Sequence, residues 1–168
     1  MKHNKTYYNP QLSEHFLLKE YLEGKSMPKK AIGLSYRDYN IEADNYIRKN
    51  ISLIESIREW ANYEFLFEVN EEIPVIILSG FRSVEWEKLR GRSGNSQHTI
   101  GAVDLRFDVS DELNSKIIRA MYDKLHNDRY MGGLAINKSN NLYSFLHIDF
   151  RLPSAQHKAR GYGARWMY

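Results

Sequence analysis

The segment YSFLHIDF (residues 143–150) is the most informative part of this chain for its architecture. Its aromatic and β-branched residues favour an extended strand. Side chains two apart on a strand project from the same face, so His147 and Asp149 share one face and the apolar residues beside them share the other. An imidazole and a carboxylate on one face indicate a polar cleft, rather than a core, on that side of a sheet.

A second strand is predicted at AVDLRF (residues 102–107). Apolar residues alternate with Asp104 and Arg106 in this segment, so Asp104 stands on the face opposite an apolar stripe. Two neighbouring strands of this kind would present Asp104 and His147 to one point.

His98 completes a set of candidate metal ligands. Zinc hydrolases typically hold the metal with three nitrogen or oxygen side chains and leave a fourth position for water, whose proton the cation makes labile near neutral pH. His98, Asp104 and His147 form such a set, and we expect a Zn²⁺ site on one face of the sheet. The chain has no cysteine, which excludes thiolate ligands and a cysteine nucleophile.

Each ligand has a simpler alternative. A histidine in a polar, glycine-containing stretch such as residues 91–101 is ordinarily a solvated loop residue. His147 lies in an otherwise apolar strand, where a hydrogen-bonded core histidine is an alternative. Asp104 could instead form a salt bridge with Arg82 or Arg106.

Several short motifs resemble those of a known family: SGFRS (79–83), NSQH (95–98), Gly101 with Asp104, and FLHID (145–149). Together they are similar to the peptidase M15 zinc D,D-peptidases, which have a Hedgehog/DD-peptidase-like fold. The segment LSEHF (12–16) is similar to the N-terminal segment of the carboxypeptidase-like branch often found in phages. The resemblance therefore covers most of the chain.

This resemblance implies a function. It implies that His98, Asp104 and His147 bind zinc, and that Arg82 steadies the carbonyl oxygen or carboxylate of the substrate. The implied substrate is the stem peptide of peptidoglycan, cleaved by a D,D-carboxypeptidase or an endopeptidase of the endolysin type. Guanidinium geometry suits bidentate recognition of a terminal carboxylate, which agrees with the role implied for Arg82.

Further substrate-binding residues are expected beside Arg82, namely Ser83, Ser96 and Gln97. Small hydroxyl side chains at turns more often bond nearby backbone than act as nucleophiles, and we expect Ser96 to shape the loop that aims His98.

The catalytic acid–base group is less directly indicated. Several branches of the family carry Glu or Asp three residues before the last zinc histidine, and this chain has Ser144 there. Asp149 is the nearest candidate because it shares a face with His147, either as the proton acceptor or as a partner that holds the histidine.

The spacing between the first two ligands also departs from the family. The usual pattern H-x-x-G-x-A-x-D separates them by seven positions, whereas His98 and Asp104 are six apart. A deletion inside the strand would turn Asp104 to the wrong face, and a deletion in the loop at residues 99–101 would leave the register intact. The short spacing and Ser144 motivate an alternative function, a catalytically degenerate binding or structural module such as a phage virion component. A zinc enzyme acting on another peptide or amide is a third possibility.

The remaining pattern predicts an α+β fold, a small antiparallel sheet with flanking helices. Helical spacing of apolar residues predicts a long helix over residues 40–65 and a second one from Ser110 to about residue 127. Further strands are predicted at residues 73–78 and 130–136, the latter joined to the His147 strand by a polar turn at residues 138–141.

Composition is consistent with one soluble domain. The chain has 168 residues, 42% of them hydrophobic, and we expect a single domain over residues 1–168. Its N-terminus is polar and its longest apolar run is too short to cross a bilayer, so no signal peptide or membrane insertion is expected. A wall-directed enzyme of this kind would be phage-encoded or released to reach its substrate.

The expected partner is peptidoglycan or its peptide fragments. The net charge of +3 is modest, and the basic and aromatic residues interleaved over residues 151–168 are expected to form a tail that packs its rings on the core. No nucleic-acid partner is expected. His15 and His157 are the substitute ligands that the sequence offers, whereas His3 and His126 are expected to be exposed.

Overall fold

A computed structural model describes residues 11–151, 156 and 163–167. The helices and strands follow one another in the order α1 (Leu18–Leu22), α2 (Lys29–Asp38), α3 (Ile41–Val69), β1 (Val75–Ser79), α4 (Val84–Leu89), the 3₁₀ turn η2 (Gln97–Thr99), β2 (Val103–Phe107), α5 (Asp111–Asn127), β3 (Gly133–Ser139), β4 (Leu142–Asp149) and β5 (Arg165–Met167).

The five strands form one open sheet in the order β1-β2-β4-β3-β5. The first three pairings are antiparallel, and β5 pairs with β3 in parallel. The α+β class is confirmed, but the prediction of a purely antiparallel sheet is wrong. The chain returns after β4 and adds a short strand to the outer edge of β3, and this pairing leaves no local mark in the sequence.

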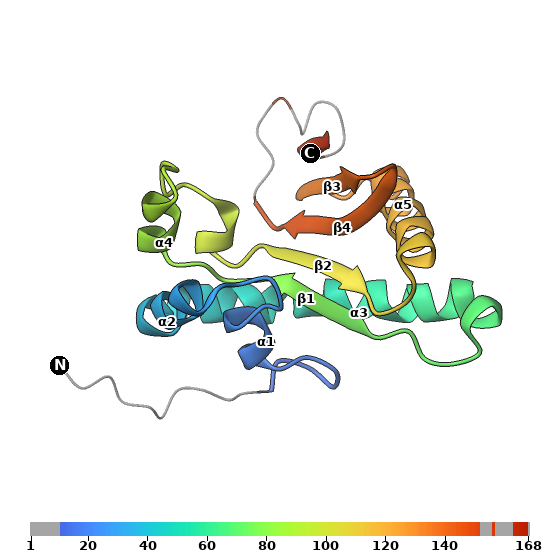
Figure 1. Cartoon of the computed structure of the whole chain (residues 1–168), viewed down its shortest axis with the longest axis horizontal. Coiled ribbons are helices and arrows are strands. Elements are labelled where there is room, and N and C mark those ends of the chain that lie inside the picture. The colour runs from blue at the N-terminus through green and yellow to red at the C-terminus, as the bar shows by residue number, and fades with distance from the viewer. Residues whose placement is uncertain (1–10, 152–155, 157–162, 168) are drawn as a thin grey trace.

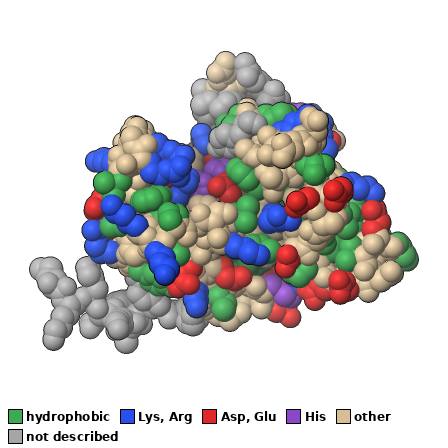
Figure 2. All heavy atoms as spheres, viewed as in Figure 1, with side chains coloured by type: hydrophobic (Ala, Val, Ile, Leu, Met, Phe, Trp, Pro, Cys, Tyr) green, Lys and Arg blue, Asp and Glu red, His purple; other side chains and the backbone are tan. Residues whose placement is uncertain are grey.

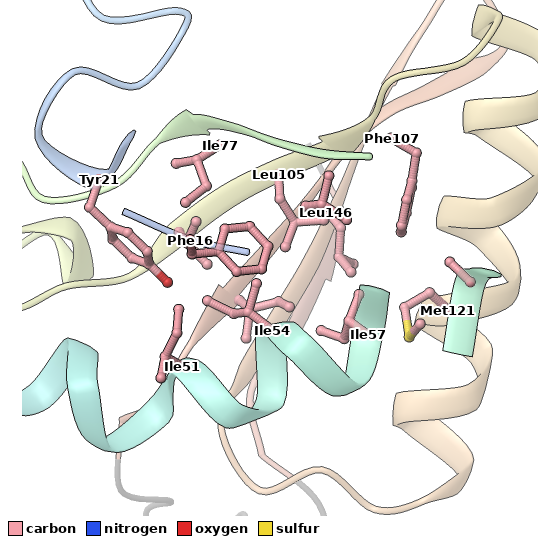
Figure 3. Close-up of a cluster of buried hydrophobic side chains, with 14 of the residues drawn as sticks. Phe16, Tyr21, Ile51, Ile54, Ile57, Ile77, Leu105, Phe107, Met121 and Leu146 are labelled. Carbon is pink, nitrogen blue, oxygen red and sulfur yellow. The ribbon is translucent and has the colours of Figure 1, made fainter. Parts of the chain in front are cut away.

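One face of the sheet forms the core with α3 and α5 (Figure 1). Alternate residues of β2 and β4, among them Leu105, Phe107 and Leu146, are fully buried against isoleucines of α3. Figure 3 shows Ile54 and Ile57 directed toward these strands, with Met121 of α5 beside them. The apolar reverse face predicted for both strands is therefore confirmed, which leaves Asp104 and His147 on the other face.

The two long helices begin at side-chain caps. Asn40 accepts a hydrogen bond from the backbone N–H of Ala43 at the start of α3, and Ser110 accepts one from Leu113 at the start of α5. Both helices are confirmed, and α3 continues four residues past its predicted end, to Val69, where the left-handed backbone of the C-cap Asn70 (φ 57°) terminates it.

The hairpin between β3 and β4 is also confirmed. Asn140 and Asn141 both have positive φ at its turn, a conformation that asparagine tolerates better than most residues. Within the described part of the chain, none of the helices combines the length and the apolar character that crossing a bilayer requires.

Candidate metal centre

The three predicted ligands meet on the face of the sheet away from the core. Asp104 of β2 and His147 of β4 are direct partners in the strand register, and His98 reaches them from η2. One ligand atom from each of the three lies within 4.8 Å of the others, so the group could hold a metal ion. The group lines a cleft of about 660 Å³. In Figure 2, histidine and acidic side chains lie in a hollow beside the Lys and Arg side chains over α4 and the loop that follows it.

The loop around η2 aims the imidazole of His98. Ser96 caps this turn by accepting the backbone N–H of His98 at 3.3 Å, as its predicted loop-shaping role requires. The Nδ1 atom of His98 lies 2.8 Å from the carbonyl oxygen of Gly80, to which it donates. In the neutral ring this contact leaves the lone pair on Nε2, which faces Asp104 Oδ2 at 3.3 Å.

His147 lies between two carboxylates. Its Nδ1 is 2.6 Å from Asp104 Oδ1, and its Nε2 is 3.4 Å from Asp149 Oδ2. If Nε2–H points to Asp149, Nδ1 is the nitrogen left for a metal. Each histidine then has one nitrogen held by the protein and one directed at Asp104, the arrangement in which partners behind the ligands set their orientation.

The short His98 to Asp104 spacing does not disturb the site. The residues between these two ligands form a loop from η2 to β2, in which Gly101 adopts a positive φ of 113°. Asp104 therefore keeps its register, opposite the buried Val103 and Leu105. It contacts the two histidines, whereas Arg106 pairs with Asp111, so the proposed Asp104–Arg106 salt bridge is wrong.

Asp149 lies behind His147 and is fully buried. Its Oδ1 accepts the backbone N–H of Gly133 at 3.0 Å and that of Arg151 at 3.1 Å. The guanidinium of Arg151 binds both carboxylate oxygens, with Nε at 2.8 Å from Oδ1 and 2.9 Å from Oδ2. Asp149 is absent from the residues that line the cleft. This carboxylate is thus held in place and holds His147 in turn.

The electrostatics of the group favour a charged carboxylate. Burial alone would raise the pKa of Asp104, but His98 and His147 outweigh it and hold that pKa well below its ordinary value. Burial alone would likewise lower the pKa of His147, but hydrogen bonds that the protonated ring donates to Asp104 and Asp149 raise it. The group therefore stabilises a positive charge at its centre, either a proton on a histidine or a metal ion.

Arg82 and Glu87 form the neighbouring wall of the cleft. The backbone N–H of Arg82 donates to the carbonyl oxygen of His98 at 2.9 Å, which ties the end of the β1 segment to η2. The Nε atom of Arg82 lies 3.1 Å from Oε1 of the buried Glu87. Ser96 and Gln97 line the cleft, whereas Ser83 is buried and caps α4 by accepting the N–H of Trp86.

Several cleft residues were not predicted as part of the site, among them Glu87, Arg92, Asn137 and Trp166. Trp166 comes from β5. In the sheet register, Ala135 of β3 lies between His147 of β4 and Trp166 of β5, so these three residues are neighbours across the strands. The side chain of Ala135 is small, and the centroids of the Trp166 and His147 rings lie 5.3 Å apart above it. The prediction that the tail packs its rings on the core is wrong for Trp166. The interleaved charges and rings of residues 151–168 were the only signal for it.

The other histidines take no part in this group. His15 pairs with Glu55 at 3.0 Å, and the ring of His126 stacks on that of Tyr122. His3 and His157 lie outside the described residues.

Comparison with known proteins adds no assignment. The chain matches no protein-family model, no curated protein and no solved structure.

Proposed function

We propose that this protein is a zinc-dependent hydrolase of peptide bonds in the stem peptides of peptidoglycan. One observation carries the proposal: two histidines and one aspartate converge within 4.8 Å of one another, and all three line a cleft. The sequence motifs that surround these residues, which resemble those of the M15 peptidases, suggest the substrate.

The donor chemistry of the group suits zinc. Two imidazole nitrogens and one carboxylate oxygen are a common ligand set of catalytic zinc sites, and the cleft leaves a side open for a fourth ligand. Without a cation, the lone pair of His98 Nε2 would face Asp104 Oδ2 at 3.3 Å, which is unfavourable unless a proton lies between them. A metal ion at this point would satisfy both atoms.

The protein's own residues would then divide the work. Bound zinc would supply Lewis-acid polarisation of the scissile carbonyl and a lowered pKa for water. In their neutral forms, His98 and His147 would each present one free nitrogen to the metal when their other N–H groups donate to the Gly80 carbonyl oxygen and to Asp149. Arg82 lines the same cleft and would bind the terminal carboxylate of the substrate or stabilise the developing oxyanion.

The role of Asp149 follows from its contacts. Both carboxylate oxygens are engaged by Arg151, and Arg151 together with His147 holds the pKa of Asp149 well below its ordinary value even though burial opposes this. A carboxylate stabilised in its charged form is a weak proton acceptor. Its contacts therefore support a role in orienting His147 over a role as general base.

The pairing of the cleft carboxylates favours one alternative, a metal-binding module without catalysis. Besides Asp104, the carboxylate among the described cleft residues is Glu87, and it is paired with Arg82 and Arg92. The described lining thus offers no unpaired carboxylate as a general base. A cleavage assay separates the two functions, because both retain the metal.

The first experiment is the zinc content of tag-free protein by elemental analysis, with an Asp104→Ala variant beside it. We expect about one zinc per chain in the wild type and none in the variant. Asp108→Ala removes an exposed carboxylate four residues further along and should keep the metal. Zinc in neither the wild type nor the control, after incubation with added metal, would overturn the proposal.

The second experiment is product analysis on purified peptidoglycan. Wild-type protein should release D-alanine or shortened stem peptides, and His147→Ala should release neither. Zinc binding without any product would favour the metal-binding module.

A further inference from the structure

Glu87 joins two arginines at one wall of the cleft. It is fully buried, with Oε1 3.1 Å from Arg82 Nε and Oε2 3.0 Å from Arg92 Nη1. The two arginines differ in exposure, because the side chain of Arg82 is 13% exposed and that of Arg92 is 48% exposed. One carboxylate therefore anchors a cation inside the cleft and a second cation at its rim.

This cluster carries more positive than negative charge. A buried carboxylate is tolerated only when it is paired, and here two guanidinium groups share it, which leaves a net positive charge. Glu87 occupies the Nε side of Arg82, and Nη2 of Arg82 is 3.5 Å from the hydroxyl of Ser96, another residue of the cleft. The terminal nitrogen Nη2 of Arg82 thus lies toward the cleft lining.

We propose that Arg82, Glu87 and Arg92 form a carboxylate-binding subsite beside the metal group, in which Glu87 is the positioning residue. The choice of ligand, the terminal carboxylate of a short peptide, rests on the proposed function. Arg82 binds the carboxylate from within the cleft and Arg92 from its rim. Glu87 touches no ligand and acts by holding both guanidinium groups.

The direction in which Glu87→Gln changes the affinity for an anion separates a positioning role of Glu87 from an effect of net charge. Glu87→Gln removes a negative charge, so net charge alone predicts that an anion binds more tightly to the variant. If Glu87 orients the arginines, the variant binds the anion more weakly, because Arg82 loses the partner that fixes it. A role in stability alone would change the melting temperature and leave the preference for an anion unmoved.

The experiment is calorimetric titration of the full-length, zinc-loaded chain with D-alanyl-D-alanine and with its C-terminal amide. The wild type should bind the free acid at least about tenfold more tightly than the amide, since hydrogen bonds to charged groups are worth this much. Glu87→Gln should reduce the preference to about threefold or less, because it lowers the affinity for the free acid and leaves the affinity for the amide unchanged. Glu85→Gln is the matched control, because Glu85 is exposed, pairs with Arg37 and carries the same charge.

A second pair of variants keeps the test independent of the folding of Glu87→Gln. Arg92→Gln should lower the affinity for the acid by about three- to tenfold. Arg90→Gln removes an equal charge from an exposed arginine that lies over the Trp86 ring, and it should leave the preference unchanged.

The outcomes distinguish the subsite from the function. No preference for the acid in the wild type, an unchanged or larger preference in Glu87→Gln, or equal effects of Arg92→Gln and Arg90→Gln would each overturn the subsite. A preference that responds as expected, in a protein that cleaves no peptidoglycan, would support the subsite and overturn catalysis. Cleavage of peptidoglycan by a protein that shows no preference for the acid would support catalysis and overturn the subsite.

Discussion

At the scale of single residues, the metal group depends on what lies behind His147. Asp149 fixes this histidine, and Asp149 is itself fixed by Arg151 and by the backbone N–H of Gly133. Gly133 is needed for more than its N–H, because a Cβ atom at this position would overlap the carboxylate of Asp149. The orientation of the buried His147 ring thus depends, through Asp149, on a glycine of the neighbouring strand.

Replacing Gly133 by alanine should therefore displace Asp149 and loosen His147. We expect a loss of about 1–3 kcal/mol in the free energy of unfolding, as for other overpacked buried sites, and a zinc affinity lowered by about tenfold or more. Urea denaturation and zinc titration measure the two effects. Gly33→Ala is the control, because a Cβ at this exposed position of α2 meets nothing, and it should be neutral or stabilise by about 0.5–1 kcal/mol. An unchanged zinc affinity in Gly133→Ala would contradict this account.

At the scale of elements, the spacing of apolar residues predicted the long helices and the strands with regular alternation. The isoleucines of α3 and the alternation in β2 and β4 are local patterns, and the structure places these elements where the patterns do. The short helices α1, α2 and α4 were not predicted, because few turns give too little periodicity to detect. The pairing of β5 with β3 joins segments about thirty residues apart, and no local pattern encodes it.

The candidate site divides in the same way. His98, Asp104 and His147 stand in recognisable motifs, so their convergence could be predicted from sequence. Glu87 and Trp166 could not, because their places in the cleft depend on the turn of α4 and on the return of β5. Helix α4 places Glu87 in the buried interior, although a charged residue on a short helix ordinarily faces solvent.

Asn114 couples α5 to the two strands that carry Asp104 and His147. It is buried, accepts the N–H of Phe107 in β2 at 2.9 Å, and donates to the carbonyl oxygens of Tyr143 and Ser144 in β4 at 3.2 Å. Its contacts fall at the ends of the strands away from the metal group.

Asn114→Ala should destabilise the fold without emptying the metal site. Because it leaves buried backbone groups unpaired, we expect a loss of about 2–4 kcal/mol, measured by urea denaturation. The folded variant should still bind about one zinc per chain. Asn127→Ala, at the exposed end of α5, should stay within about 0.5 kcal/mol of the wild type. A loss of zinc from folded Asn114→Ala would show that α5 sets the metal geometry.

At the scale of the whole molecule, the metal group joins distant parts of the chain. η2, β2 and β4 each contribute one ligand, so a bound ion would cross-link the sheet to η2, whose His98 carbonyl oxygen accepts the backbone N–H of Arg82. A ligand that binds the folded state alone raises stability by about 2.7 kcal/mol at a hundredfold excess over its Kd. Zinc should therefore raise the melting temperature of the wild type and not that of Asp104→Ala.

This stabilisation should grow with pH, because metal and proton compete for the same nitrogen. Asp104 and Asp149 raise the pKa of His147 despite its burial, so the metal-free fold gains stability from the protonated histidine at low pH and loses it as the pH rises through the raised pKa. The metal requires the unprotonated form. The increase in melting temperature on adding zinc should thus widen from about pH 6 to about pH 8, the range in which histidines titrate. Thermal unfolding with and without a fixed excess of zinc measures this, and an increase that narrows as the pH rises would show that the ion binds elsewhere.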